Sequence, residues 1–545
     1  MNSKSIKNKY FLLIFLATFC CFSLLGCTGK KTAVELGNEQ QILHRGNGTE
    51  PEALDPHIVT GVPEHHILLA LFEGLVTLDP KTLEIIPAVA KSWDISDDGK
   101  VYTFHLRDDA KWSNGDPVTA KDFVFSYKRI LSRNLGALYA DRFYAIEGAQ
   151  DYHKGILEDF SKVGITALDD HTLQIRLLKP LPYFLTLISF MAWYPVHEAT
   201  ILKYGAIDQR GTAWSRPGNM VSNGPFKLKS WDLSDKLVVE RNPFYWDNDV
   251  VRLNEIHFYP LSDANTEERA FRSGQLHVTE TLPLSKVESY KKTPYLFLAP
   301  YFSTYGYAFN TKKPPFDDKR VRQALSLAID RKAIIENVTK RNEHPAFSFV
   351  PPGTLGYGSS VKLEENVGKA KKLLEQAGYS NGGGFPKVTL LYNTSDAHKS
   401  IAEALQYMWE KNLNIHVELV NQEWKVFLKA RAGGEYNLFR LGWVGDYLDP
   451  NAFLEIFTSN SGNNMSGWSN KDYDNFIAQA NSTLDQKKRF DYFNKAEALL
   501  LDELPFLPIY FYNSAYLIQP SVKNWFPNLI DFHSYKDIYL ESDEE

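Results

Sequence analysis

The sequence is nearly without cysteine. Its 545 residues include three cysteines, Cys20, Cys21 and Cys27, and none follows position 27. Because the body of the chain has no cysteine pair, disulfide bonds do not hold it together and its stability must come from packing. A chain of this length also exceeds what one hydrophobic core supports, so we expect two or three domains.

Sequence motifs of catalysis and metal binding are also missing. The 14 histidines form no HExxH motif and no Cys–His spacing of a zinc site. The chain has no glycine-rich dinucleotide motif, no P-loop and no GxSxG turn. Paired acids occur in turn-like or helix-start contexts, where carboxylates usually form turns or caps: Asp97–Asp98, Asp169–Asp170 and Asp317–Asp318. The sequence therefore favours a binding protein, without cofactor or metal, over an enzyme.

Two adjacent histidines, His65 and His66, lie within the predicted helix "EHHILLALFEGL". Neighbouring residues of a helix point to different faces, which is a poor geometry for shared metal binding. We therefore expect solvent-facing or helix-capping roles for this pair.

Strongly basic patches are lacking as well. The formal charge of the whole chain is −6, and it becomes −9 when the three lysines of residues 1–26 are removed. An acidic body without basic clusters argues against nucleic acids and anionic membrane surfaces as partners. After residue 26, no apolar run approaches the roughly 20 residues that a membrane-spanning helix needs.

The N-terminus carries the features of an export signal. "MNSKSIKNKY" has three lysines and no acid, and the apolar run 11–26 that follows is too short to cross a bilayer. "LLGC" at 24–27 resembles the lipobox of bacterial lipoproteins, which implies a signal peptide over 1–26 and a diacylated Cys27. An ordinary soluble export signal is the alternative. We expect residues 27–40 to form a mobile tether, so that the protein is exported, periplasmic or at the cell surface, and anchored through lipid.

The first half of the chain mixes strands and helices. Residues 101–107, "VYTFHLR", alternate apolar and polar side chains as a half-buried strand does. Thr119 can cap a helix over 120–131. Residues 224–231 and 236–242 form a predicted hairpin.

From residue 316 onward, helices and strands alternate regularly. Helices are predicted over 317–335, 370–379, 398–412 and 424–433, and strands over 387–393, 415–421 and 436–443. This alternation is typical of an α/β domain with a largely parallel sheet.

Several stretches resemble family 5 extracellular solute-binding proteins, over residues 41 to 545 in unbroken order. They include "LDPHIVTGVPE", "AKSWDISDDGKVYTFHLRDDAKWSNGDPVTAKDFVFSYKR", "NPFYWDN" and "KPPFDDKRVRQALSLAIDR". Two more, "LLYNTSDAHK" and "NQEWKVFLKARAGGEYNLFRLGWVGDYLDP", resemble the oligopeptide-binding branch of that family in particular.

The resemblance implies an α/β fold of the periplasmic-binding-protein (Venus-flytrap) type. Two lobes close over the ligand, an extra domain is inserted, and the sheets are mixed. Carried onto this chain, lobe I spans 41–73, 199–298 and 514–545, domain II spans 74–198, and lobe III spans 299–513. The alternating helices and strands after residue 316 fall within lobe III.

The segment "LFRLGWVGDYLDP" (438–450) places charges in a strand that is otherwise apolar. A buried charge is costly unless it is paired and hydrogen-bonded, and internal protein pairs are one solution. The resemblance implies another, because a peptide brings an ammonium and a carboxylate. By it, Asp446 pairs with the peptide's amino terminus, and Arg440 and His398 meet the carboxylate of short peptides.

The resemblance also implies recognition of the peptide backbone, which adds as a strand between two protein segments. The matching residues are Thr60, Gly61 and Val62 in lobe I and Gly442, Trp443 and Val444 in lobe III. Gly61 and Gly442 have no side chain to hinder a close backbone approach. Further matches line the side-chain pockets: Tyr139, Trp424, Arg431 and Asn463. For these four, a core aromatic or an exposed polar group is an equal alternative.

One region departs from the family pattern. A lysine of the family near the carboxylate site aligns roughly with Thr339, with Lys340 beside it, and residues 341–365 look shorter than the pattern. The departure concerns the part of the site that would hold the C-terminal end of a longer peptide.

The function implied is that of the substrate-binding lipoprotein of a peptide ABC importer, a monomer that delivers short peptides to membrane permease subunits. Within the family, murein peptides, dipeptides, haem or a nickel chelate are alternative ligands. From other classes, an exported peptidase or an adhesin remains open.

Overall fold

The structure is a computed structural model of the chain, and it describes residues 31–352, 354–445, 447–483 and 485–542. The predicted signal peptide and two residues predicted to be functional, Cys27 and Asp446, lie outside the described residues. Within the described part of the chain, no helix is both long enough and apolar enough to cross a membrane.

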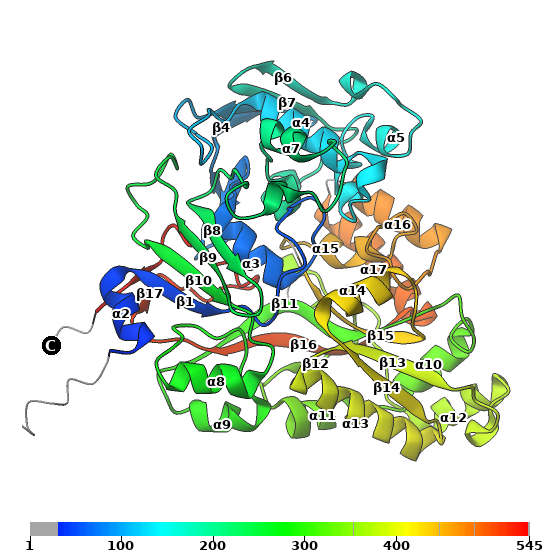
Figure 1. The fold of residues 1–545 in the computed structure, drawn as a ribbon. Helices are drawn as coiled ribbons and strands as arrows, with labels where there is room; N and C mark the ends of the chain where they lie inside the picture. Colours follow the sequence, from blue (N-terminus) through cyan, green and yellow to red (C-terminus); the bar gives the residue numbers. More distant parts are fainter. Residues whose placement is uncertain (1–30, 353, 446, 484, 543–545) are drawn as a thin grey trace, which may run out of the picture.

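The segments predicted to form lobe I contain a four-stranded sheet with the order β1-β10-β9-β8 (Figure 1). Strand β1 runs parallel to β10, and the other pairs are antiparallel, including the predicted hairpin β8–β9. The strands are β1 Ile42–Gly46, β8 Phe226–Asp232, β9 Lys236–Arg241 and β10 Glu255–Tyr259, and the helices are α2 Ala33–Gln40, α3 Val62–Leu71, α8 Ala264–Arg272 and α9 Val287–Tyr290. Two short pairs lie outside this sheet, β2 Val76–Leu78 with β3 Ile85–Pro87, and β17 Val522–Lys523 with β18 Tyr539–Leu540.

Helix α2 corrects the expected extent of the tether. Residues 33–40 were expected to be mobile, but they form a helix that begins with a capping box between Thr32 and Glu35. Val34 and Asn38 are buried, and Asn38 Oδ1 lies 3.1 Å from His277 Nε2. The cap and this buried face dock the segment on lobe I, so any tether ends before residue 32.

Domain II is a four-stranded antiparallel sheet with the order β4-β5-β7-β6, flanked by helices. Its strands are β4 Ala90–Ile95, β5 Val101–Leu106, β6 Ile165–Asp169 and β7 Thr172–Arg176, and its helices are α4 Ala120–Ile130, α5 Ala149–His153 and α6 Phe184–Ile188. Thr119 caps α4 in a capping box with Asp122, as the sequence predicted. Helix α7 Glu198–Tyr204 follows the predicted boundary and packs against α4.

Lobe III contains a six-stranded sheet with the order β12-β16-β11-β15-β13-β14. Its strands are β11 Leu296–Phe309, β12 His344–Pro345, β13 Val388–Asn393, β14 Val417–Gln422, β15 Leu438–Val444 and β16 Phe506–Leu517. The prediction of a largely parallel sheet is right for half of it. Strands β14, β13 and β15 are parallel, whereas β11, β16 and β12 join by antiparallel pairing.

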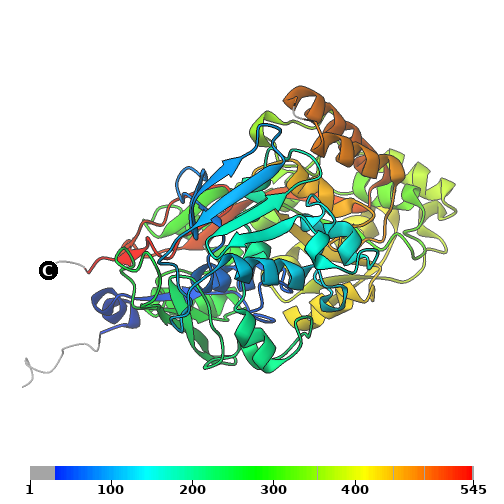
Figure 2. The same cartoon turned by 90° about the horizontal axis from the view of Figure 1, so that it is seen from above.

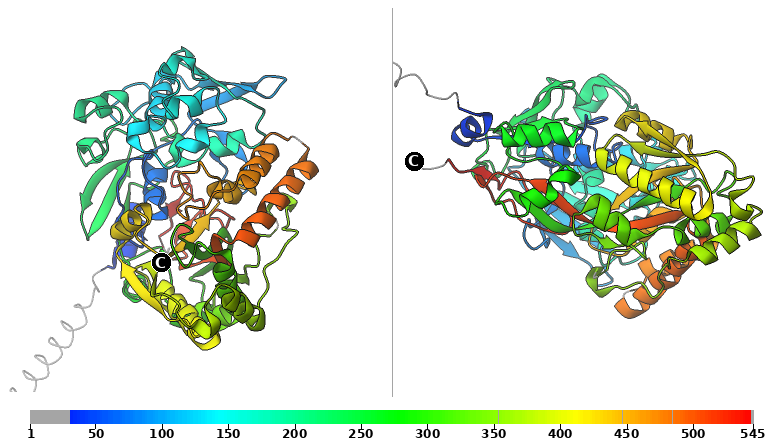
Figure 3. Two further views of the ribbon diagram at one scale, coloured as in Figure 1. Left: turned by 90° about the vertical axis from the view of Figure 1, so that its right-hand side faces the viewer. Right: turned by 90° about the horizontal axis from the view of Figure 1, so that it is seen from below.

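The helices of lobe III are α10 Lys319–Leu327, α11 Arg331–Ile334, α12 Val367–Gln376, α13 Asp396–Leu413, α14 Trp424–Ala432, α15 Asn451–Leu454, α16 Lys471–Asn481 and α17 Gln486–Glu503. The single helix predicted over 317–335 is wrong. It divides because Asp330 caps a new helix, its side chain accepting from the backbone of Ala333. Helices α16 and α17 pack side by side at the outer edge (Figure 3).

Two long strands, β11 and β16, run from lobe I into lobe III (Figures 1 and 3). They pair from Leu296 opposite Leu517 to Ala308 opposite Phe506, with one register shift between Tyr305 and Gly306 and another between Pro300 and Thr304. The predicted boundaries of lobe III, at 299 and 513, fall next to this shift. The connection between the lobes is therefore a two-stranded ribbon with two irregular points.

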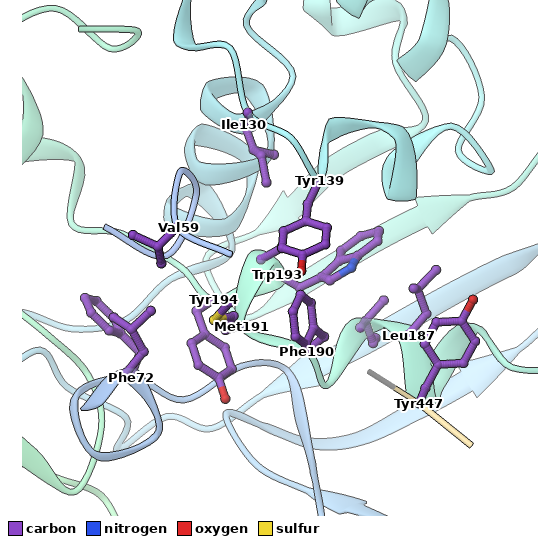
Figure 4. Close-up of a cluster of buried hydrophobic side chains, with 14 of the residues drawn as sticks. Val59, Phe72, Ile130, Tyr139, Leu187, Phe190, Met191, Trp193, Tyr194 and Tyr447 are labelled. Carbon is purple, nitrogen blue, oxygen red and sulfur yellow. The ribbon is translucent and has the colours of Figure 1, made fainter. Parts of the chain in front are cut away.

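Domain II contacts both lobes, and Figure 2 shows it in front of them when the molecule is seen from above. A buried cluster of mostly aromatic side chains joins it to its neighbours (Figure 4). In this region, the rings of Tyr183 and Tyr447 stack at 5.2 Å, and Arg142 pairs with Glu455 at 2.6 Å. Packing against lobe III thus fixes the position of domain II.

Candidate ligand-binding site

A cavity of about 400 Å³ lies where lobe I, domain II and lobe III meet. It is lined by all the residues predicted to bind ligand that the structure describes: Thr60, Gly61, Val62, Tyr139, His398, Trp424, Arg431, Arg440, Gly442, Trp443, Val444 and Asn463. Their contact with a ligand stays a prediction. Asp446 lies outside the described residues, although its neighbour Gly445 lines the cavity.

The lobe III wall is formed where two neighbouring parallel strands separate. Strand β15 pairs with β13 only at Leu438 and Phe439, and with β11 along its whole length on the other side. Among the described residues, the β13-facing edge of 440–444 therefore has no strand partner. Past the point of separation, the cavity is lined by residues 393–395 on one side and 440–445 on the other. A crevice at the carboxyl ends of parallel strands is a common place for ligands.

Side chains along β15 alternate between the protein interior and the cavity side. Leu441 and Trp443 are buried, whereas Arg440, Gly442 and Val444 are partly exposed on the cavity side. The indole of Trp443 donates to the carbonyl of Ala452 at 2.7 Å, so its polar group is used inside the protein. The three partly exposed residues are thus the ones best placed to meet a guest strand.

The guanidinium of Arg440 is held by tyrosines. Its Nη2 donates to Tyr512 Oη at 2.7 Å, and its Cζ lies 5.2 Å from the ring centroid of Tyr305. Tyr305 Oη in turn lies 3.2 Å from His398 Nδ1. Among the described residues, no carboxylate lies within ion-pair distance of Arg440, so its charge is oriented but not neutralised.

His398 is neutral in this setting, because burial, followed by the charges of Arg440 and Arg341, holds its pKa well below the usual range. Arg341 and Arg431 also line the cavity without a carboxylate partner among the described residues. Lobe III therefore presents guanidinium groups and a neutral imidazole, a set suited to an anion such as a carboxylate.

At two predicted positions, the groups closest to the glycine are the ends of the protein's own side chains. A Cβ at Gly442 would lie 2.6 Å from Arg440 Nη2 and 2.9 Å from Tyr512 Oη. At Gly61, a Cβ would lie 2.0 Å from Glu64 Oε2. On lobe I the predicted guest-strand neighbour is a short extended turn, because Gly61 precedes α3 and Val62 is its first residue.

Several cavity residues were missed by sequence reasoning. Thr339 and Lys340 do not line the cavity, but Arg341 does, and it lies in the segment that departs from the family pattern. The prediction for His65 and His66 is wrong, since both line the cavity and His66 is buried. Glu280 and Asp531 add carboxylates from lobe I, and neither position carries a motif that would have marked it.

No group of three or more His, Cys, Asp or Glu side chains that could hold a metal ion is found in the described ranges. The cavity therefore offers hydrogen bonds and single charges. Its features are an open strand edge, oriented cations on lobe III and two carboxylates on lobe I. It has the means to bind an extended, charged organic molecule by both ends and by its backbone.

Comparison with known proteins places the whole chain in context. Residues 84–465 match the family described as bacterial extracellular solute-binding proteins, family 5 Middle. The periplasmic oligopeptide-binding protein OppA of Escherichia coli is 39% identical over 499 residues, which cover 89% of each chain. The structure of Haemophilus influenzae OppA in complex with the peptide RPPGFSPFR superposes with a TM-score of 0.88, at 35% identity, covering 92% of this chain and 99% of that one.

A third relative informs on the arrangement of the lobes. The murein tripeptide binding protein MppA of Escherichia coli superposes with a TM-score of 0.87, at 38% identity, covering 92% of this chain and 98% of that one. The unliganded open form of MppA, with the same identity and coverage, gives 0.63. Since sequence and fold are the same in both comparisons, the difference lies in the positions of the lobes, and the present structure is not in the open arrangement.

Proposed function

This chain belongs to the bacterial extracellular solute-binding proteins of family 5, and we propose that it binds short peptides between its two lobes and delivers them to the permease of a peptide ABC importer. The family match and the three-part α/β architecture confirm the predicted fold class. Its relatives are solute-binding proteins, and the proposed role is likewise binding and not catalysis.

The observation that carries this proposal is the open edge of β15 at residues 440–444 on the cavity wall. Main-chain groups of an extended peptide can complete this edge without regard to the peptide's sequence. Arg440, at the start of the same edge, has no carboxylate partner among the described residues and can pair with the carboxyl terminus. Asp446, from the sequence pattern, is proposed to receive the amino terminus.

Closure of the lobes is the proposed signal to the permease. A ligand that contacts both lobes favours the closed state over the open one by its difference in affinity for the two. The superpositions described above support a closed arrangement for the present structure. The proposed location is outside the cytoplasmic membrane, with the protein held by lipid on Cys27.

Calorimetry with three versions of one tripeptide tests the proposal. The free peptide should bind, an N-acetylated version should bind more weakly because it lacks the ammonium, and a C-terminal amide should bind more weakly because it lacks the carboxylate. Small-angle scattering should show compaction with the free peptide. If the free peptide neither binds nor compacts the protein, and no peptide in a mixed library does, the proposal is wrong.

A murein peptide is a second candidate ligand, favoured by the match to the murein tripeptide binding protein. Nutrient peptides and cell-wall peptides can share a free amine and a carboxylate, so the cavity features named above suit both. Native mass spectrometry of protein purified from its own host separates the two, because murein peptides and protein-derived peptides differ in mass.

A further inference from the structure

Glu280 lies on the lobe I wall of the cavity, held by a rigid backbone. The segment before it bridges two strands, since Gly46 N donates to the Val278 carbonyl at 2.8 Å and Thr279 N donates to the Leu517 carbonyl at 2.9 Å. The buried carboxyl group of Glu267 accepts from Glu280 N at 2.8 Å and Thr281 N at 3.2 Å. Glu267 therefore acts as a positioning residue for the backbone at Glu280 and Thr281.

The carboxylate of Glu280 is only loosely paired. Its Oε2 lies 3.5 Å from Arg45 Nη2. Other buried carboxylates of this protein bind arginine tightly through both oxygens, as Asp449 does with Arg489 at 2.6 and 2.7 Å. One quarter of the Glu280 side chain is exposed, and it lines the cavity. Glu280 therefore has capacity for a further cationic partner.

His66 supplies a second, independent feature beside Glu280. Its side chain is only 6% exposed and lines the cavity, and its Nδ1 lies 3.5 Å from Glu280 Oε2. This Nδ1 has no hydrogen-bond partner among the described residues. Burial first, and then the charge of Arg45, holds the pKa of His66 well below its usual range, so the ring is neutral and one ring nitrogen can accept a hydrogen bond.

Near Glu280 there is one more carboxylate than there are permanent positive charges. Burial acts to raise the pKa of Asp531, but His533 and Arg45 bring it below its usual range, so Asp531 is ionised and balances Arg45. The groups that face this cluster are Arg45 from β1, His65 and His66 from α3, Glu267 from α8, Tyr516 from β16, and Asp531, His533 and Tyr535 from the C-terminal segment. Of these, only Arg45 carries a permanent positive charge.

The pKa of Glu280 shows how this excess negative charge is reduced near neutral pH. Burial raises the pKa of Glu280 to about 7, although Arg45 acts to lower it. At neutral pH the carboxyl group is therefore protonated about half of the time. A cation that enters the site would favour the ionised form and release the proton.

We infer that Glu280 and His66 form a subsite for a basic side chain of the bound peptide, an alkylammonium group in addition to the one at the amino terminus. The carboxylate of Glu280 supplies the counter-charge, and the neutral ring of His66 beside it adds no positive charge that would compete with the ammonium. The inference rests on the proposed function, and it makes this protein a binder that prefers peptides with a lysine-like residue at one position. The guanidinium groups of lobe III and the carboxylate of Glu280 on lobe I then hold opposite charges of the same ligand.

Calorimetry with alanine tripeptides and tetrapeptides tests this subsite. Each peptide carries at one position either lysine or norleucine, which has the same carbon chain without the ammonium. At one position, lysine should bind about tenfold or more tightly than norleucine. Glu280→Gln should remove that preference by weakening the binding of the lysine peptide, so that the lysine and norleucine peptides bind to the variant with equal affinity. Glu240→Gln, on β9 and outside the cavity, is the matched control and should keep the preference.

A measurement on the unmodified protein also tests the subsite, and its result does not depend on whether the Glu280→Gln variant folds. At pH 7, binding of the lysine peptide should release about half a proton, seen as a different heat in phosphate and in Tris, because Glu280 becomes ionised. The norleucine peptide should release none by this route. If lysine and norleucine peptides bind equally at every position, the subsite is disproved while the peptide-binding function stands. If no peptide binds at all, the proposed function and the subsite fall together.

Discussion

The guanidinium of Arg440 lies against the ring of Tyr305, 5.2 Å from its centroid, while Tyr305 Oη approaches His398 Nδ1 at 3.2 Å. Two residues from different elements, β15 and α13, are thereby joined through a third on β11. This arrangement orients a positive charge that has no carboxylate partner among the described residues. It provides the first of five predictions.

Replacing the charge of Arg440 should weaken binding of peptides with a free carboxylate. We expect Arg440→Met to cost about 2–5 kcal/mol in affinity for a tripeptide acid and much less for its amide, measured by calorimetry. Arg269→Met, at an exposed position of α8, is the control. Equal losses for acid and amide would show that Arg440 supports the packing of Tyr305 and does not bind the carboxylate.

Asp446 is predicted from the sequence pattern to receive the peptide's amino terminus. We expect Asp446→Ala to weaken binding of a free tripeptide by about 3–5 kcal/mol, the scale for leaving a buried charge without its partner. The N-acetylated tripeptide should lose far less, because it brings no ammonium. An unchanged calorimetric affinity for the free peptide would contradict this role.

Arg341 connects the two lobes across the cavity. Its Nη2 donates to Thr281 Oγ1 at 3.0 Å and to the carbonyl of Leu282 at 2.5 Å. We expect Arg341→Ala to weaken peptide binding by about 1.5–3 kcal/mol, the usual worth of hydrogen bonds from a charged group, because it removes contacts of the closed state. At a fixed, sub-saturating peptide concentration, small-angle scattering should then show a smaller closed fraction. A closed fraction equal to that of the unmodified protein would contradict this prediction.

The buried pair of Asp449 and Arg489 should matter for stability. The two residues share bonds of 2.6 and 2.7 Å, and their side chains are 2% and 7% exposed. We expect Asp449→Ala to lower the free energy of unfolding by about 3–5 kcal/mol, because it leaves the guanidinium buried and unpaired. Glu336→Ala breaks an exposed pair with Lys332 and should cost at most about 0.5 kcal/mol in the same thermal or urea unfolding experiment. Similar effects of the two changes would contradict the prediction.

The raised pKa of Glu267 predicts that the free energy of unfolding depends on pH. Burial raises its pKa to about 8, whereas an unfolded glutamate has 4.5. Its contribution to stability is therefore fully present below pH 4.5 and is lost as the pH rises toward 8, by at most about 1.4 kcal/mol per pH unit. Glu267→Gln does not titrate, so it should gain stability relative to the unmodified protein between pH 4.5 and 8. A difference in unfolding free energy that stays constant over this range would show that the pKa of Glu267 is not raised.

The sequence predicted helices and strands correctly where the signal, such as a helix cap or an alternation of apolar residues, lies within the segment itself. The capping box at Thr119 and the alternation of residues 101–107 are found as helix α4 and strand β5. Residues 27–40 carry a signal of the same kind at Thr32 and Glu35, but their polar composition predicts a mobile tether, and this prediction is wrong for residues 33–40. The prediction of a largely parallel sheet in lobe III is right for half of the strands. Strand–helix alternation indicates parallel pairs but gives no sign of the antiparallel strands β11 and β16 that join them.

The residues of the cavity depended on the resemblance more than on spacing. His398, Arg440 and Tyr139 come from three separate parts of the chain, and no local pattern states that they meet. Arg45, His66 and Glu280 were missed for the same reason, since tertiary structure alone brings the three together. For His66 the periodicity of the helix gave the wrong answer, because it predicts which residues share a face but not what covers that face.

The open edge of β15 has a consequence for how the protein behaves in solution. A strand edge with free main-chain groups is a template on which other chains can pair, and on an outer surface it promotes aggregation. Here the edge is enclosed, between the divergence of β13 and the walls of lobe I and domain II. In the closed form, these unpaired main-chain groups are therefore accessible only to a chain that fits inside the cavity.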